Sequence, residues 1–198
     1  MPDGSNKADY QAGPQPGGRE PAPGALGLVQ AFVNSNYDLE HGHGAELLGD
    51  PRALRVWLAA RGLMRAGEPV DDGDLARALA VREGLRALLI ANNGGVLDRA
   101  AVAELDAAAA HASFGVRLAT NSPEFEPHAS GVGGALATIL AVATRSMLDG
   151  SWQRFKACRQ HDCRWAFYDH SRNAAGNWCS MRVCGGRAKQ RAYYRRRR

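Results

Sequence analysis

The sequence predicts an α+β protein that is mainly helical, in which a helical N-terminal domain with a small β-hairpin precedes a small four-cysteine module. Apolar residues recur at helical spacing through most of residues 25–150, and one short stretch there alternates with the period of a strand. All four cysteines lie within residues 151–198, a segment too small to bury much surface. We therefore expect a disordered tail at 1–24, a helical domain at 25–150 that folds alone, and a cysteine module at 151–198.

The tail is expected to be disordered because residues 1–24 hold five Pro and five Gly without any apolar periodicity. Helical spacing begins after it, with the four apolar residues Leu28, Val29, Phe32 and Val33. The next helix should begin with Asp50 as its N-cap and Pro51 in its first turn, and should end at Gly62.

Three further helices are expected in this domain. The aspartates within 71–74 suit the positive end of a helix that continues to a stop at 92–95. An alanine-rich helix should follow over 98–112. A long helix with an apolar face should cover 132–148, with Met147 in the core.

One stretch between these helices changes period, because Phe114, Val116 and Leu118 alternate with residues of other kinds. This alternation predicts a strand. A lone strand would leave its backbone groups unpaired, so its partner should be the segment near Phe125, across a turn at 121–123.

The four cysteines have a symmetric spacing, with four, fifteen and four residues between them. They are Cys158, Cys163, Cys179 and Cys184. Two close pairs allow two tight turns to present four sulfurs to one ion without an open coordination position, so we predict one structural Zn²⁺ and no catalytic metal. Two disulfides, an iron–sulfur cluster, and a site in which His161 or His170 replaces one thiolate are the alternatives.

The rest of the cysteine module is expected to form a short hairpin and a basic helix. Trp165, Phe167 and Tyr168 predict a hairpin that turns around 173–177 and supplies a small aromatic core. The helix should begin at an N-cap on Ser180 and reach nearly to the end of the chain.

The two faces of this last helix differ in chemistry. At about 100° per residue, one side points to the metal and the core and carries Met181, Cys184, Ala188 and Ala192. The opposite side is basic and carries Arg182, Lys189, Tyr193 and Arg196, flanked by Arg187, Arg191 and Arg198. The candidate nucleic-acid contacts are therefore Arg172, Arg182, Arg187, Lys189, Arg191 and Arg196.

The charge of the chain is unevenly distributed. The formal net charge is +5, but residues 151–198 hold 13 Lys and Arg against two Asp, a balance of +11, whereas residues 1–150 have a balance of −6. A strongly basic module is typical of proteins that bind polyanions. A solubilising tail is the alternative interpretation.

The sequence also indicates where the protein resides. The N-terminal residues include Pro, Gly, Asp and Gln where a secretory signal would need an apolar stretch, and no apolar run approaches the roughly 18 to 20 residues of a membrane span. We expect a soluble cytoplasmic protein without a membrane partner, in a compartment where cysteines stay reduced.

A family resemblance is carried by the cysteine module. The matching residues run from Cys158 through Trp165, Phe167, Asp169, Ser171, Arg172, Asn173, Trp178, Cys179, Ser180, Met181 and Cys184 to Gly185, Gly186, Arg187 and Lys189. This stretch resembles the CGNR-type zinc finger of bacterial transcription regulators. The preceding residues, roughly 26–150, are similar to the ABATE-type domain that accompanies this finger, on motifs at 32–34 and 81–86.

Two positions depart from the pattern of that family. Gly186 stands where the Cys-Gly-Asn-Arg motif has asparagine, and Ala31 stands where an aspartate often precedes Phe-Val-Asn. The contribution that either polar side chain makes in the family is therefore missing here.

The resemblance and the charge together lead to the expected function. The resemblance implies a zinc-dependent transcription regulator, and the charge implies nucleic acid, most plausibly double-stranded DNA. The N-terminal domain would sense a small molecule or form a homodimer, with Asn34, Arg82 and Arg86 as candidate ligand contacts, although for the two arginines the bridging of acidic loops is the favoured interpretation. An RNA-binding or protein-interaction module is the alternative. We do not expect an enzyme, because no nucleophile–base pair, phosphate loop or open metal motif occurs.

Overall fold

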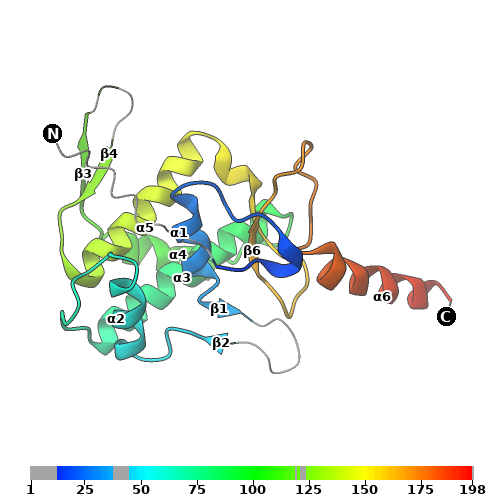
Figure 1. Cartoon of the computed structure of the whole chain (residues 1–198), viewed down its shortest axis with the longest axis horizontal. Coiled ribbons are helices and arrows are strands. Elements are labelled where there is room, and N and C mark those ends of the chain that lie inside the picture. Colours follow the sequence, from blue (N-terminus) through cyan, green and yellow to red (C-terminus); the bar gives the residue numbers. More distant parts are fainter. Residues whose placement is uncertain (1–12, 38–44, 119, 121–123, 198) are drawn as a thin grey trace.

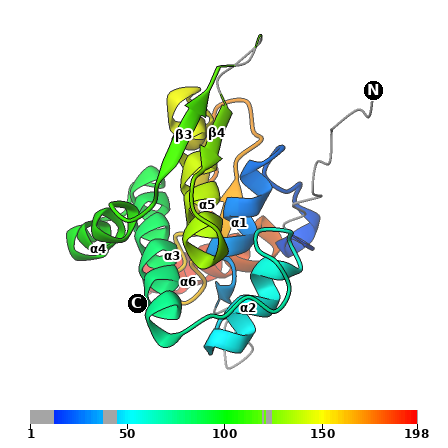
Figure 2. The same cartoon turned by 90° about the vertical axis from the view of Figure 1, so that its left-hand side faces the viewer.

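Five helices form the N-terminal part of the protein, in a computed structural model that describes residues 13–37, 45–118, 120 and 124–197 (Figure 1). They are α1 (Leu26–Val33), α2 (Pro51–Ala59), α3 (Asp72–Asn92), α4 (Arg99–Ala109) and α5 (Gly131–Leu148). The long helix α3 is central, because α1, α2, α4 and α5 all pack against it. Figure 2 shows α4 on the outer side of α3, where Gly84 allows the close approach, since a Cβ there would clash with Leu105.

The helix starts follow the capping residues that the sequence predicts. Asp50 accepts a hydrogen bond from the Ala53 N–H at 2.6 Å, with Pro51 at the first helical position. Asp71 and Asp74 form a reciprocal capping box at the start of α3, and Asp98 caps α4. These side chains satisfy N–H groups that the first turn of a helix leaves unpaired.

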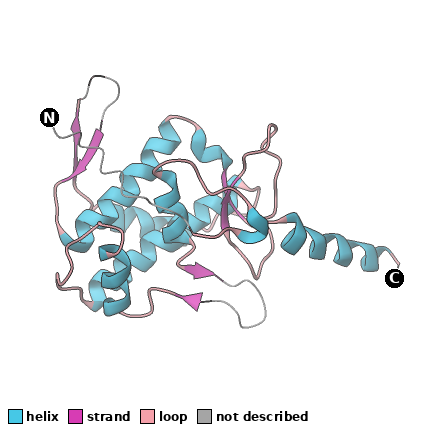
Figure 3. Cartoon of the chain, in the orientation of Figure 1, coloured by secondary structure: helices cyan, strands magenta, loops and turns pink. Residues whose placement is uncertain are grey.

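The described residues also contain three two-stranded antiparallel hairpins (Figure 3). The predicted hairpin of the N-terminal part is present as β3 (Phe114–Arg117) and β4 (Glu124–Pro127), while its expected turn at 121–123 lies outside the described residues. A second hairpin, β1 (Asn36–Tyr37) with β2 (Ala45–Glu46), was not predicted.

The third hairpin corrects the one predicted for the cysteine module. β6 (Ala166–Tyr168) pairs with β5 (Phe155–Ala157) and not across the segment 173–177. All six strand residues are buried. With three residues, Phe-Lys-Ala, β5 is too short for its alternation to predict a strand.

The hairpin β5–β6 shares its core with the N-terminal helices. Trp152, Phe155, Ala166 and Tyr168 belong to the same buried cluster as residues of α1, α3 and α5. Asn93 Nδ2 adds hydrogen bonds to the carbonyls of Ala157, at 2.7 Å, and Asn177. The core of residues 25–150 therefore continues across the expected boundary into the cysteine module, and the folding of 25–150 alone stays a prediction.

The expected disorder of residues 1–24 is also wrong for the part that the structure describes. Residues 13–24 contain a 3-10 turn, η1 (Pro16–Gly18), and lie against the cysteine module. Arg19 donates hydrogen bonds to the carbonyls of Tyr168, Trp178 and Cys179. The amino-acid composition predicts disorder, but a proline- and glycine-rich segment can be ordered by residues that are distant in sequence.

Two further expectations, both about the helix α5, are wrong. Its 18 residues have a mean hydropathy of 1.4, enough by length and composition for a membrane span, but half of this window is buried inside the protein. Packing against α1 and α3 explains its apolar character, as in the core helix of a soluble protein. Met147, expected in the core, is 43 % exposed at the end of α5.

The shared core yields a stability prediction. Phe155→Ala should lower the free energy of unfolding by about 3–5 kcal/mol, because it leaves a cavity beside Trp152 in the common core. Urea titration followed by far-UV circular dichroism and tryptophan fluorescence should give one coincident transition. Val116→Ala, at an exposed position of β3, should cost no more than about 0.5 kcal/mol. Separate transitions for the helices and the cysteine module would contradict a shared core.

Candidate metal centre and basic helix

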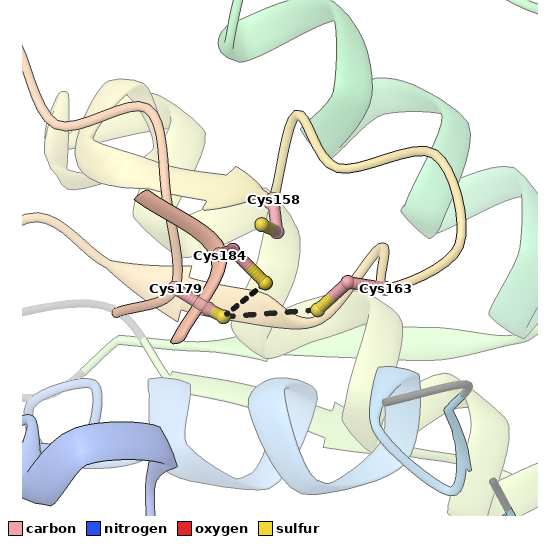
Figure 4. Close-up of side chains that lie close together, drawn as sticks. All are labelled: Cys158, Cys163, Cys179 and Cys184. Carbon is pink, nitrogen blue, oxygen red and sulfur yellow. Dashed lines mark hydrogen bonds between the residues drawn. The ribbon is translucent and has the colours of Figure 1, made fainter. Parts of the chain in front are cut away.

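Four buried cysteine sulfurs converge on one point in the structure (Figure 4). The Sγ atoms of Cys158, Cys163, Cys179 and Cys184 all lie within 4.8 Å of one another. Cys163 Sγ is 3.7 Å from Cys179 Sγ, which is 3.6 Å from Cys184 Sγ. Four sulfurs at about 2.3 Å from a tetrahedral Zn²⁺ would be about 3.8 Å apart, so the cluster has the dimensions of a zinc site.

The local backbone positions each pair of cysteines. Cys158 directly follows β5, and its N–H donates to the Trp165 carbonyl at 2.9 Å, which closes the loop that also holds Cys163. Cys179 precedes Ser180, whose Oγ accepts from the Arg182 N–H and caps a π-helical turn, η3 (Met181–Gly185), that contains Cys184. Each pair is therefore held by a tight turn, as its spacing predicts.

A bound cation would allow all four cysteines to be thiolates. In a metal-free cluster, the three neighbouring thiols stabilise a Cys158 thiolate and lower its pKa, whereas packing against that thiolate raises the pKa of Cys163 and of Cys179. Four thiolates cannot coexist at such distances without a compensating positive charge. One structural Zn²⁺ meets this requirement and fits the all-sulfur donor set.

The alternatives to a four-thiolate site do not fit the geometry. Sulfurs at 3.6–3.7 Å are too far apart for the roughly 2.05 Å of a disulfide bond. His161 is exposed and pairs with Asp162, and His170 Nε2 lies 2.9 Å from the Pro21 carbonyl oxygen. Neither histidine belongs to the cluster of candidate ligands.

Aromatic residues surround the metal site. Trp165 and Phe167 are buried with the cysteines, and Tyr37 and Trp178 pack against them. The rings of Tyr37 and Trp165 meet edge to face at 5.3 Å between centroids. These side chains form a small core that excludes water from the sulfurs, which confirms their expected structural role and leaves Trp165 and Phe167 unable to stack on bases.

A buried ion pair, not singled out in the sequence, shapes the loop between the cysteine pairs. Lys156 Nζ lies 3.2 Å from Asp169 Oδ2, and Asp169 also accepts from Ser171 Oγ and from the Gly176 N–H, both at 2.6 Å. Burial alone would raise the pKa of Asp169, but the hydrogen bonds from Ser171 and Gly176, together with Lys156, lower it to about 2. The carboxylate is therefore ionised and organises the loop.

The basic helix α6 (Gly186–Arg196) contains no buried residue. It extends away from the rest of the protein (Figure 1), and it packs mainly on the π-helical turn η3. Of the six candidate nucleic-acid contacts, all but the half-buried Arg187 are exposed: Arg172, Arg182, Lys189, Arg191 and Arg196. Arg172 lies apart from the helix, in the loop that Asp169 organises, and Arg191 donates a hydrogen bond to Gln160 Oε1.

The inner face predicted for this helix is only partly correct. Cys184 points to the metal site, but Met181 is 52 % exposed, and Ala188 and Ala192 are only half-buried. The π-helical turn changes the angle between successive residues, so a regular 100° projection from Ser180 misplaces Met181. Beyond this turn, α6 leaves the core altogether.

Gly186, which stands where the family has asparagine, occupies the first position of α6. Its φ and ψ of −60° and −46° are ordinary helical values. A Cβ at this position would lie 3.4 Å from the Met181 carbonyl oxygen, an ordinary contact. Neither strain nor space requires glycine here.

The three candidate ligand contacts are engaged within the protein. Arg82 forms a bidentate pair with Glu46, both distances being 2.7 Å. Arg86 donates to Glu83 and to the carbonyls of Val33, Asn36 and Arg164, a zinc-site neighbour. Asn34 exchanges two hydrogen bonds with the backbone of Ala166 in β6. Asn34 and Arg86 therefore join the helices to the cysteine module, whereas Arg82 bridges to the hairpin β1–β2, so the expected bridging of acidic residues by the arginines is present and a ligand role stays a prediction.

The fold and the site define the class of protein: a helical domain joined to a four-cysteine zinc finger that ends in an exposed basic helix. Residues 154–197 match the family model described as "CGNR zinc finger", and residues 17–150 match ABATE, described as "Putative stress-induced transcription regulator". The chain therefore belongs to the ABATE family, with a CGNR zinc finger at its C-terminal end. The curated proteins with which the chain was compared include none that matches it.

Zinc content gives the first test of the site. The purified protein should contain one zinc per chain, and replacing any of the four cysteines by serine should remove the metal, because the other three sulfurs do not complete the tetrahedron. Elemental analysis measures the metal. Since the finger shares the main core, Cys179→Ser should also lower the stability of the whole chain. Intramolecular disulfides without metal in protein prepared under reducing conditions would contradict this site.

Asp169 gives a second test, with a defined pH dependence. Asp169→Asn should lower the free energy of unfolding by about 3–5 kcal/mol at pH 7, because Lys156 stays buried without its partner. The pKa of Asp169 is below its ordinary value, so its stabilising charge is complete above about pH 4 and is lost only as pH falls towards 2. Urea titrations should therefore give the same difference from wild type between pH 6 and 8. A difference that changes steeply over this range would contradict the assignment.

Proposed function

We propose that this protein is a cytoplasmic, non-enzymatic transcription regulator that binds double-stranded DNA through α6. The observation that carries the proposal is a basic helix without a buried residue, fixed at its base by a zinc site. A helix that buries no residue in its own protein is best explained by a role in binding a partner. The family description supports a regulatory role.

The charge of the finger supports a polyanionic partner. Residues 151–198 have a balance of +11, and four thiolates with one Zn²⁺ would reduce it to +9. The sequence of α6 contains no acidic residue. Its arginines and lysine are therefore not neutralised by carboxylates within the helix, and phosphate groups would supply the missing negative charge.

The dimensions of α6 favour the major groove. Eleven helical residues span about 16 Å, and the major groove, about 12 Å wide, admits one α-helix. Arg182 at the helix base and Lys189 and Arg196 along it are exposed. Arg182 is our candidate for reading a base edge, because the start of a recognition helix most often reaches the bases.

RNA is the second candidate partner, and a specific observation favours it. Tyr193 and Tyr194 are 45 % and 59 % exposed on α6, and exposed aromatic rings among arginines suit the stacking of unpaired bases. Competition between a DNA duplex, single-stranded RNA and polyglutamate would separate these partners from an acidic protein. Homodimer formation stays a prediction for solution measurements.

The dependence of affinity on salt tests the proposal. About four to six phosphate contacts should give a slope of log affinity against log salt near −4 to −5, and removing one contact should reduce the slope by about one unit. Lys189→Ala and Arg196→Ala should behave in this way. Arg182→Ala should instead cost about 1–3 kcal/mol on a selected site, with a smaller effect on random duplex.

The control is Arg99→Ala, which removes an exposed arginine at the start of α4 and should leave affinity and slope unchanged. Fluorescence anisotropy on selected and random duplexes measures all variants in their zinc-loaded form. Binding that does not depend on salt, or full affinity in the triple alanine variant at Arg182, Lys189 and Arg196, would reject α6 as the recognition element.

A further inference from the structure

We propose that the protein has an effector site for a small, uncharged and largely apolar molecule, and that residues 15–26 couple this site to the zinc finger. The site is the hollow between the start of α1, β4 and the second half of α5. Its effect on nucleic acid rests on the proposed function, whereas the binding of a ligand there does not.

The hollow has the size and lining of a small-molecule site. Its volume is about 630 Å³, within the range of about 300–1,000 Å³ typical of ligand pockets. Apolar side chains from three elements line it, namely Leu26 of α1, Phe125 of β4, and Ala141 and Val142 of α5. Thr138 and residues 23–26 also line it, and the Thr138 hydroxyl is already hydrogen-bonded to the Gly134 carbonyl.

The charges at the rim favour an uncharged ligand. Glu124 forms an ion pair with Arg117. Asp149 accepts a hydrogen bond from the Ser151 N–H at 2.9 Å and interacts with the charge of Arg145. A charged ligand would have to compete with these pairs, whereas an uncharged one would bury apolar surface and leave them intact.

One wall of the hollow continues directly into the segment that holds the finger. Pro23, Gly24, Ala25 and Leu26 line the hollow. Gly24 has a positive φ of +54°, so the chain turns sharply between this wall and the preceding residues. The Ala22 N–H donates at 2.7 Å to Gln30 Oε1, and Gln30 Nε2 donates at 2.9 Å to Gln15 Oε1.

The other end of this segment grips the finger beside the metal site. The Arg19 guanidinium donates to the carbonyls of Cys179, Trp178 and Tyr168, at 2.8, 3.1 and 3.1 Å, and lies 4.6 Å from the centroid of the Phe167 ring. Trp165 Nε1 donates to Gln15 Oε1 at 2.9 Å.

Gly17 completes this grip at the base of the basic helix. It packs so closely on Ser180, the cap of the turn before α6, that a Cβ there would overlap Ser180 Oγ. The segment therefore holds both the second cysteine pair and the helix base.

Whether a ligand strengthens or weakens nucleic-acid binding depends on the conformation of the protein in which the hollow is open. The structure combines an open hollow with a segment that grips the finger, so a ligand that fits this hollow favours the gripped state over states in which the segment has moved. The gripped state fixes the base of α6 and lowers the entropy lost on docking. Ligand binding should therefore strengthen nucleic-acid binding, typically by about 5-fold or more.

The site is tested with N-phenyl-1-naphthylamine, an uncharged apolar fluorophore, and the zinc-loaded full chain. We expect saturable binding of one probe per chain. Val142→Trp, which fills the hollow, should weaken binding by about tenfold or more. Val96→Trp, at an exposed position between α3 and α4 that does not line the hollow, should bind as wild type does. Equal binding by both variants, or no saturable binding to wild type, would overturn the site.

The coupling is tested by duplex affinity with and without saturating probe. Probe should raise the affinity of wild type by about 5-fold or more, and Arg19→Ala should bind the probe but lose this increase. Arg19→Lys keeps the charge without the three-way grip and should lose most of it, with zinc content and circular dichroism showing that the variants are folded. If the probe does not change the duplex affinity of wild type, the coupling is overturned while the proposed function stands. A chain that binds the probe but no nucleic acid would instead remove the proposed function and leave the site.

Discussion

The structure depends on one constraint. Four cysteine thiolates share one cation, in a segment too small to be stabilised by its own buried apolar surface alone. The zinc site draws together two turns that are separated by fifteen residues of sequence. It cannot stabilise the finger alone, because the strands β5 and β6 are buried on both faces and one of these faces belongs to the helical core. Metal binding and the packing of α1, α3 and α5 are therefore linked in a single folding unit.

Features with a local cause were predictable from the sequence. The aspartate caps at positions 50, 71 and 98, the ends of α2 and α3, and the pairing of β3 with the segment around Phe125 depend on neighbouring residues and appear as expected. The zinc ligands were predictable for the same reason, since the spacing within each pair encodes its turn. The basic character of α6 follows from composition alone.

Features with a distant cause were not predictable. The ordering of residues 13–24 depends on carbonyl groups that Arg19 meets about 150 to 160 positions later, and no local pattern records such contacts. The partner of β6 was missed because β5 has only three residues, and its buried Lys156 is explained only by Asp169, thirteen positions later. The sequence predicts that Arg82 and Arg86 bridge to acidic residues, but it does not identify the distant backbone partners of Arg86 and Asn34 in the cysteine module, Arg164 and Ala166.

The lack of buried residues in α6 has a consequence for how such a protein changes over time. Substitutions along this helix disturb no packing, so they cost little folding free energy, and the stability of the chain places almost no limit on which side chains it displays. With the proposed partner, selection on α6 would act through binding, whereas the finger base and the helices stay under the constraint of a common core. A chain of this design can acquire a new target by altering one helix, with its fold and its metal left as they were.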